Sequence, residues 1–183
     1  MIITWQVALR IGLLLTLSVV LQLAFFSSLS ILGATPDVLP VIAVALGLLG
    51  GGVIGAVCGF CLGLLTDSLL LQTLGVSSLV LLTVGYLAGR WRESFDITSA
   101  LVPPLLVAGL TLLAASLFAA IQLMLGVESP VSLLVLREIV VQALLGGLLA
   151  IPIYPGVRRL LRPALIEDTP RRRRARLAPI RAA

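Results

Sequence analysis

A ladder of small residues in the middle of the chain restricts its fold more than any other feature of the sequence. Within an apolar stretch, every fourth residue is a glycine until the series ends in an aspartate: Gly51, Gly55, Gly59, Gly63 and Asp67. A glycine inside a helix costs about 1 kcal/mol relative to alanine, so this spacing indicates a helix whose backbone lies very close to another backbone. Small residues four apart are typical of helices that associate within a lipid bilayer.

The amino-acid composition indicates that a bilayer is the solvent of this chain. Hydrophobic residues make up 60% of the sequence and charged residues only 11%, whereas soluble domains carry about 25% charged residues. A membrane-spanning helix needs about 20 apolar residues, and runs of this kind fill most of the chain up to residue 161. The sequence therefore predicts an all-α membrane protein with no room for a soluble domain.

Side chains that commonly carry catalysis are scarce. The chain has no histidine, and all thirteen of its basic residues are arginine. This removes the commonest general base, the commonest metal ligand and Schiff-base lysine chemistry. Cys58 and Cys61 have no further ligands near them in the sequence and are interpreted as small packing residues. We expect no enzymatic activity, no metal and no cofactor.

Six apolar segments are separated by turn residues and polar loops. They cover residues 4–26, 37–49, 53–70, a fourth segment that ends at Arg92, 103–125 and 133–161. The first segment could be a signal peptide, but it is long and lacks a cleavage site, so we expect it to be retained. The second is about 20 Å long as a helix, short for a complete crossing; Thr35 is expected to cap it and Pro40 to bend it. Pro152 and Pro155 predict a kink or a break in the last segment.

The distribution of arginine predicts the orientation in the membrane. With six spans, the N-terminus, the Arg90 and Arg92 loop and the arginine-rich C-terminus share one side, which the positive-inside rule assigns to the cytoplasm. Five spans would move only the N-terminus. The expected domains are a six-helix transmembrane domain, 1–162, and a disordered cytoplasmic tail, 163–183. The tail residues Arg171, Arg172, Arg173 and Arg174 are expected to attract anionic lipid and not nucleic acid.

Charged residues also fall near the opposite, outer ends of the predicted helices. These are Asp37, Asp67, Arg137 and Glu138. A carboxylate at membrane depth is costly and usually functional, although Asp67 could instead reach water from the end of its helix. Arg137 could pair with either aspartate, whereas Glu138, rotated by about 100° on the same helix, must face something else. We predict an outer polar cluster built from the second, third and sixth helices.

The glycine ladder drifts by about 40° at each step of four residues. It therefore forms a slanted groove, which a neighbouring helix would cross with right-handed geometry. The groove has two interpretations, packing within the protein's own bundle and docking of a partner's transmembrane helix, and different glycines can serve each. We expect Gly51 and Gly55 to serve the bundle and the part nearest Asp67 to meet the partner.

The second half of the ladder also carries a family resemblance. The block 59–67 (GFCLGLLTD) is followed by TLGV at 73–76, with Pro36 before it and Tyr86-Leu87-Ala88 and IPIYP at 151–155 after it. Over residues 30–162 the chain resembles the bacterial rod shape-determining protein MreD family. Members commonly carry Ser-Gly where this chain has Leu70-Leu71, so the turn before Gly75 is expected to be shaped differently. The arginine-rich tail beyond Arg162 is not part of the family pattern.

The resemblance implies a non-enzymatic scaffold in the inner membrane that helps regulate peptidoglycan synthesis. Its implied partners are MreC and, indirectly, the MreB filament and the RodA glycosyltransferase with its penicillin-binding transpeptidase. The family is also similar to the six-helix substrate-binding subunits of energy-coupling-factor vitamin transporters, which implies the same architecture. That similarity supplies an alternative function, the binding of a small molecule in an outward cavity. Polar groups for such a cavity could come from Asp37, Asp67, Arg137, Glu138 and Gln142.

Overall fold

The computed structural model of the chain describes residues 5–25, 35–71, 75–94, 102–126 and 133–166. These residues form six α-helices and no β-strand. The helices are α1 (Trp5–Ala24), α2 (Val38–Gly50), α3 (Gly52–Leu70), α4 (Val76–Ser94), α5 (Val102–Met124) and α6 (Leu133–Ile166). Each apolar segment of the sequence thus forms one helix, with bounds within a few residues of the prediction.

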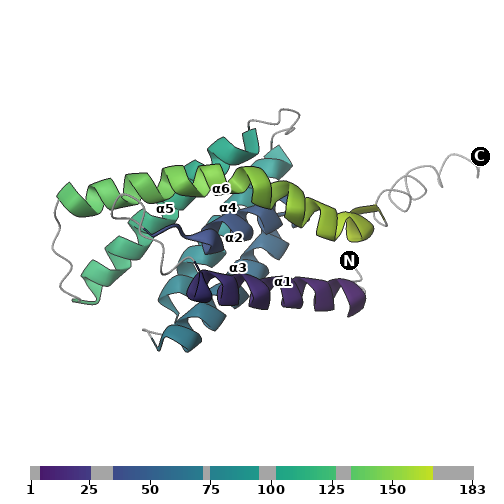
Figure 1. The fold of residues 1–183 in the computed structure, drawn as a ribbon, viewed down its shortest axis with the longest axis horizontal. Helices are drawn as coiled ribbons and strands as arrows, with labels where there is room; N and C mark the ends of the chain where they lie inside the picture. The colour runs from purple at the N-terminus through teal and green to yellow at the C-terminus, as the bar shows by residue number, and fades with distance from the viewer. Residues whose placement is uncertain (1–4, 26–34, 72–74, 95–101, 127–132, 167–183) are drawn as a thin grey trace, which may run out of the picture.

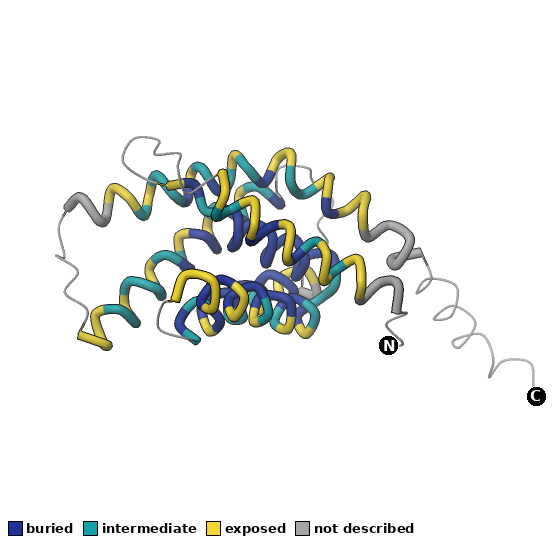
Figure 2. Tube along the Cα trace, turned by 60° about the horizontal axis from the view of Figure 1, so that its bottom comes forward, coloured by how far each residue is buried: buried dark blue, intermediate teal, exposed yellow. Residues whose placement is uncertain are grey.

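The short helix α2 lies at the centre of the bundle. It contacts all five other helices, and every residue from Val38 to Leu49 is buried. In Figure 1 the longer helices surround it, and α1 begins at the same side of the molecule at which α6 ends. In Figure 2 the buried parts of the chain gather in this interior, while the outer helices expose one face each. Because protein shields α2 from lipid, its uniformly apolar sequence reflects burial among helices.

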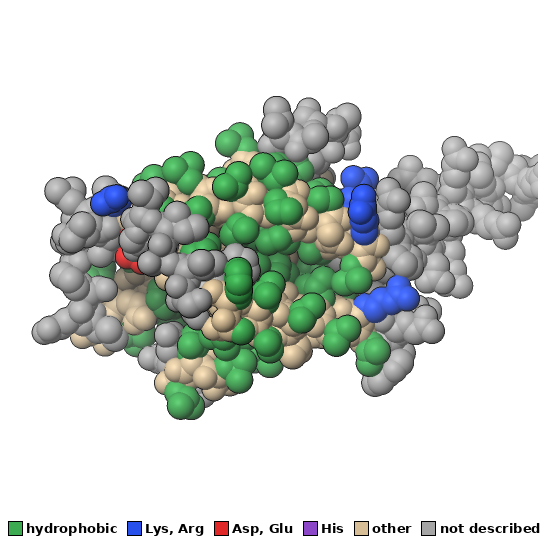
Figure 3. Space-filling model, in the orientation of Figure 1, with side chains coloured by type: hydrophobic (Ala, Val, Ile, Leu, Met, Phe, Trp, Pro, Cys, Tyr) green, Lys and Arg blue, Asp and Glu red, His purple; other side chains and the backbone are tan. Residues whose placement is uncertain are grey.

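The surface of the bundle suits a membrane. Within the described residues, three segments are long and apolar enough to cross one, Gly52–Leu70, Pro103–Met124 and Arg137–Leu160, whereas the apolar helices Leu9–Ala24 and Val38–Gly50 are shorter. Large apolar side chains are exposed on α1, α3, α5 and α6, including Leu13, Val53, Leu105 and Leu144. In Figure 3 the visible charged side chains lie toward the two ends of the molecule, with mainly apolar surface between them. The chain is an all-α membrane protein.

The start of α2 differs from the prediction. Asp37, not Thr35, is the N-cap: its backbone is extended (φ −102°, ψ 111°) and its Oδ1 accepts a hydrogen bond from the Leu39 N–H at 3.0 Å. Pro40 consequently lies in the first turn of the helix, where a backbone N–H has no helical acceptor. The expected bend at Pro40 is therefore not required, because its ring has no helical carbonyl to displace.

The last helix is continuous through the two prolines that were expected to kink or break it. Pro152 and Pro155 lie within α6, which runs unbroken from Leu133 to Ile166. The predicted break is therefore absent, although Figure 1 shows that the second half of α6 turns away from the line of the first. Both prolines are exposed, so their rings do not disturb the core. The helix also passes the predicted domain boundary at residue 162, and the arginines 171–174 lie outside the described residues.

Candidate functional site

The glycine ladder brings α3 against α4. A Cβ atom added at Gly55 would lie closer than 3.0 Å to the carbonyl oxygen of Gly85, and one added at Gly59 would meet the carbonyl oxygen of Leu81 in the same way. At Gly63 the added atom would overlap the backbone of Ser78. The two helices therefore touch backbone to backbone along most of the ladder, as small residues at this spacing allow.

This contact decides between the two interpretations of the groove. Packing within the protein's own bundle is confirmed for Gly55, Gly59 and Gly63, because α4 fills the groove. Near Gly59 and Gly63, where a partner helix was expected, α4 occupies the groove and leaves no space for a second helix. Gly51 lies outside α3: with φ 92° it forms the turn from α2, and its N–H donates to the Gly47 carbonyl oxygen at 2.8 Å.

Glycines on the opposing helices complete this contact and were not predicted to do so. Added Cβ atoms at Gly47 of α2 and at Gly55 would both overlap the Gly85 carbonyl oxygen of α4, and the one at Gly55 would also lie 2.6 Å from the Gly47 Cα. Gly89 lies against the backbone of Gly51 and Gly52 in the same manner. The pair Gly85 and Gly89, four residues apart, was the sequence pattern that could have identified α4 as the partner.

Asp67, the last residue of the ladder, links α3 to α4. Its side chain is buried, with 1% exposed, and its Oδ2 accepts a hydrogen bond from the Gly75 N–H at 2.8 Å. Gly75 (φ 102°) immediately precedes α4, so the carboxylate lies at the positive end of that helix. Asp67 is buried and does not reach water from the end of its helix, and its Oδ1 has no hydrogen-bond partner among the described residues.

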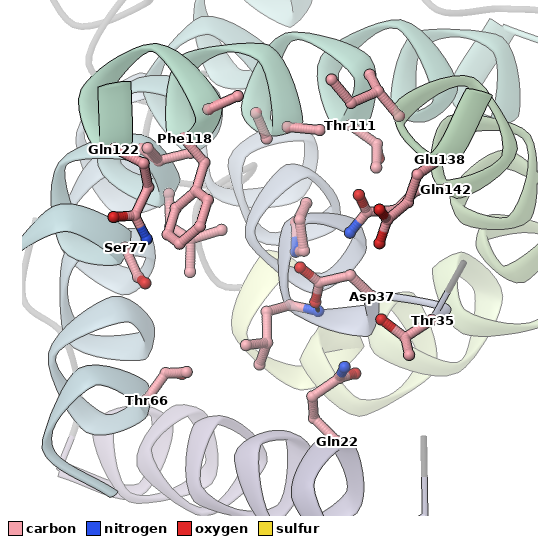
Figure 4. Close-up of a pocket in the computed structure, with 18 of the residues that line it drawn as sticks. Gln22, Thr35, Asp37, Thr66, Ser77, Thr111, Phe118, Gln122, Glu138 and Gln142 are labelled. Atoms are coloured by element: carbon pink, nitrogen blue, oxygen red, sulfur yellow. Dashed lines mark hydrogen bonds between the residues drawn. The ribbon is translucent and has the colours of Figure 1, made fainter. Parts of the chain in front are cut away.

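A cavity of about 530 Å³ lies beyond the N-terminus of α2 and touches all six helices. The central helix has 13 residues, whereas its neighbours have 19 or more, so α2 leaves part of the bundle's interior unfilled. Figure 4 shows polar side chains that reach into this space. The polar side chains that line it are Gln22, Thr35, Asp37, Thr66, Ser77, Thr111, Gln122, Glu138 and Gln142.

The cavity contains only part of the predicted polar cluster. Asp37 and Glu138 line it together with Gln142, whereas Asp67 and Arg137 do not. Arg137 is exposed, and it does not pair with Asp67, whose free Oδ1 has no partner. Of the four residues of the predicted outer cluster, only Asp37 and Glu138 therefore face one space, and Asp67 and Arg137 lie apart from them. Sequence position fixes how deep a residue lies but not which way its side chain faces.

Gln22 of α1 holds the start of α2 in place. Its Nε2 donates to the Pro36 carbonyl oxygen at 3.2 Å, and its Oε1 accepts from the Val38 N–H at 2.9 Å. With the Asp37 cap on Leu39, these bonds satisfy backbone groups that the helix itself leaves without partners. Burial raises the pKa of the Asp37 carboxyl to about 6, and the bond from the Leu39 N–H opposes this rise.

The other end of α2 is also capped by a side chain. The Arg92 Nη1, near the end of α4, donates to the Leu49 carbonyl oxygen. A cation is favourable at the negative end of a helix. Side chains from neighbouring helices therefore cap both ends of the central helix. Its N-terminal end, which borders the cavity, is held in place by these bonds.

Comparison with known protein families supports the family resemblance of the sequence around the glycine ladder. The family described as rod shape-determining protein MreD matches residues 2–164 of this chain, a range that contains the ladder, the cavity and most of α6. No curated protein and no solved structure matches the chain, so the architectural similarity to energy-coupling-factor subunits stays a prediction. Because the family match covers nearly the whole chain, this protein belongs to the MreD family of rod shape-determining proteins.

Proposed function

We propose that this rod-shape-determining membrane protein is a non-enzymatic scaffold that binds MreC. Through MreC it would connect the MreB filament with RodA and its penicillin-binding transpeptidase, and so help to regulate peptidoglycan synthesis. The family match carries this proposal. The proposed location is the bacterial inner membrane, with six crossings and both termini in the cytoplasm, as the positive-inside rule favours. In that topology the cytoplasmic arginines 171–174 attract anionic lipid.

The bundle offers a partner helix a surface other than the filled groove. On α1, Gly12 and Thr16 are exposed four residues apart between the exposed Leu9, Leu13 and Leu17. No atom of a neighbouring residue would lie within 4 Å of a Cβ added at Gly12. Small residues at this spacing let a second helix approach closely in lipid. The proposed contact for the transmembrane helix of MreC is therefore this face of α1.

Co-purification from native membranes tests both parts of the proposal. MreC is expected to co-purify with the tagged wild-type protein and to be reduced with Gly12→Leu, because the leucine fills the space between the helices. Gly109→Leu is the matched control, since Gly109 of α5 also has free space around it. Absence of MreC from the wild-type sample contradicts the scaffold. Equal recovery with both variants contradicts only the contact on α1.

A second candidate function is the binding of a small molecule, as in the substrate-binding subunits to which the family is similar. The observation that favours it is the cavity of about 530 Å³, which has mainly apolar walls and several polar side chains, since ligand sites of this character commonly measure about 300–1,000 Å³. Mass spectrometry of metabolites released from the purified protein tests it. We expect a compound that is absent from Ala115→Phe, in which the larger ring occupies the cavity that Ala115 lines.

A further inference from the structure

Among the residues that the structure describes, the lining of the cavity carries negative charge and no positive charge. Asp37 and Glu138 both line it, and no arginine is among its described lining residues. The chain has no lysine or histidine that could supply the missing charge. Arg137 neighbours Glu138 in sequence, but its side chain is exposed and lies outside the lining. Two carboxylates that face one cavity repel each other unless a proton or a cation intervenes.

Three acceptor groups converge at one end of the cavity. In Figure 4 the side chains of Glu138 and Gln142 from α6 point toward that of Asp37 at the start of α2. Among described residues, the Asp37 carboxylate accepts one hydrogen bond, from the Leu39 N–H, and so keeps capacity for others. A primary ammonium carries three donors, one for each of these side chains. Glu138 is exposed and Asp37 partly buried, so this end lies toward the surface.

The rest of the cavity suits an organic body. Its walls include the apolar side chains Leu39, Val80, Leu81 and Phe118. A bare metal ion would leave most of the about 530 Å³ unfilled. Away from the carboxylates, Gln122 of α5 and Ser77 of α4 point toward each other in Figure 4, where they can bind a neutral hydroxyl or carbonyl group.

We propose that this cavity binds a small organic cation, a primary amine whose ammonium group lies among Asp37, Glu138 and Gln142. The apolar part of the ligand packs against Leu39 and Phe118, and a neutral polar group meets Gln122 and Ser77. The inference rests on the second candidate function, that the cavity takes a small molecule. It does not depend on the binding of MreC.

Tyramine is the probe, because it combines a primary amine, an aromatic body and a hydroxyl group. Tyrosol carries a hydroxyl in place of the amine, and phloretate carries a carboxylate. Equilibrium dialysis measures the binding of each to the purified full-length protein in detergent, with protein-free micelles as the blank. Tyramine is expected to bind saturably and about tenfold tighter than the other two, because only its ammonium group can pair with the partly buried Asp37 carboxylate.

Two variants test the charge without removing the fold. Asp37→Asn keeps the helix cap, since asparagine caps as well as aspartate, and Glu138→Gln changes an exposed residue. Asp37→Asn is expected to weaken tyramine binding about tenfold and Glu138→Gln by a smaller factor, because exposed charge pairs contribute less, and both should leave tyrosol binding unchanged. Arg137→Gln, outside the lining, is the control that should bind tyramine as the wild type does.

The outcomes separate the ligand class from the site. Equal binding of all three probes, or tyramine binding that ignores both acidic variants, overturns the cation and leaves a small-molecule cavity. If none of the three probes binds, the proposal of an organic amine is overturned. If, in addition, the wild-type protein releases no metabolite, the second candidate function is overturned as well. Co-purification of MreC with Asp37→Asn and Glu138→Gln, measured on the same preparations, reports on the scaffold independently.

Discussion

Gly55 of α3 and Gly85 of α4 lie against each other in a reciprocal contact. A Cβ atom added to either glycine would fall closer than 3.0 Å to the carbonyl oxygen of the other. Gly47 of α2 joins the same contact, because its own added Cβ would also overlap the Gly85 carbonyl oxygen. Three helices therefore meet at glycine backbones, and any side chain there forces them apart.

The first prediction concerns the glycine contact between α3 and α4. Gly59→Ala is expected to destabilise the protein by about 1–3 kcal/mol, as overpacking of a tight core does, because the new methyl group overlaps the backbone of Leu81. The midpoint of thermal unfolding in detergent measures this. Gly109→Ala is the control: Gly109 is exposed with open space around it, so alanine there should be neutral or stabilising by up to about 1 kcal/mol. Equal midpoints for the two variants would contradict the contact.

The sequence predicted that a helix packs closely against the glycine ladder, but it did not identify that helix as α4. Spacing on one helix shows that something must approach closely, but it does not show which helix approaches. The complementary pair Gly85 and Gly89 lies in α4, whose polar and aromatic end is more typical of a membrane interface than of a helix contact. The apolar runs predicted the helices well, because burial and lipid both require continuous apolar residues. The caps were less predictable, since Thr35 and Asp37 are both good candidates by residue type.

The candidate site was predictable in part. Asp37 and Glu138 were identified because charged residues are conspicuous in an apolar chain, and both line the cavity. Asp67 and Arg137 were assigned to the same group by depth, but their side chains face α4 and the surface respectively. Gln22 was overlooked inside an apolar run. Its role depends on the contact between α1 and the start of α2, which no local pattern encodes.

The second prediction concerns Gln22. Gln22→Met, with a side chain of similar length, removes both hydrogen bonds to the start of α2 and is expected to destabilise the protein by about 1–3 kcal/mol, because buried backbone groups lose their partners. Amide hydrogen exchange at Val38 should accelerate as well. Thr16→Ala is the control from the same helix, since its exposed hydroxyl bonds only to the Gly12 carbonyl oxygen one turn away. Unchanged exchange at Val38 would count against the role of Gln22.

The third prediction concerns the turn after α3. Leu71 adopts a left-handed conformation (φ 51°, ψ 33°), which costs a residue with a Cβ about 1–2 kcal/mol. Glycine adopts it without strain, so the backbone at this position favours glycine over leucine. Leu71→Gly is expected to raise stability by about 0.5–1 kcal/mol, because the side chain is 92% exposed and loses little packing.

Leu70→Gly is the matched control for the turn. Leu70 is the last residue of α3, where a helical glycine is unfavourable by up to about 1 kcal/mol. Thermal unfolding midpoints should therefore shift in opposite directions for two neighbouring leucines. A lower midpoint for both variants would show that the Leu71 side chain stabilises the protein by contacts that outweigh the backbone strain.

The fourth prediction concerns Asp67, the polar end of the glycine ladder. Asp67→Ala removes the acceptor for the Gly75 N–H and is expected to destabilise the junction of α3 and α4 by about 1–3 kcal/mol. Asp67→Asn keeps one carbonyl oxygen that can accept this bond, so its loss should be smaller. Hydrogen exchange at Gly75 and the unfolding midpoint together measure the effect, with the order of stability wild type, Asn, Ala. Asparagine removes the charge but keeps an acceptor for the Gly75 N–H, whereas alanine removes both. If the two variants lower stability equally, the negative charge at the positive end of α4 stabilises the turn more than the hydrogen bond does.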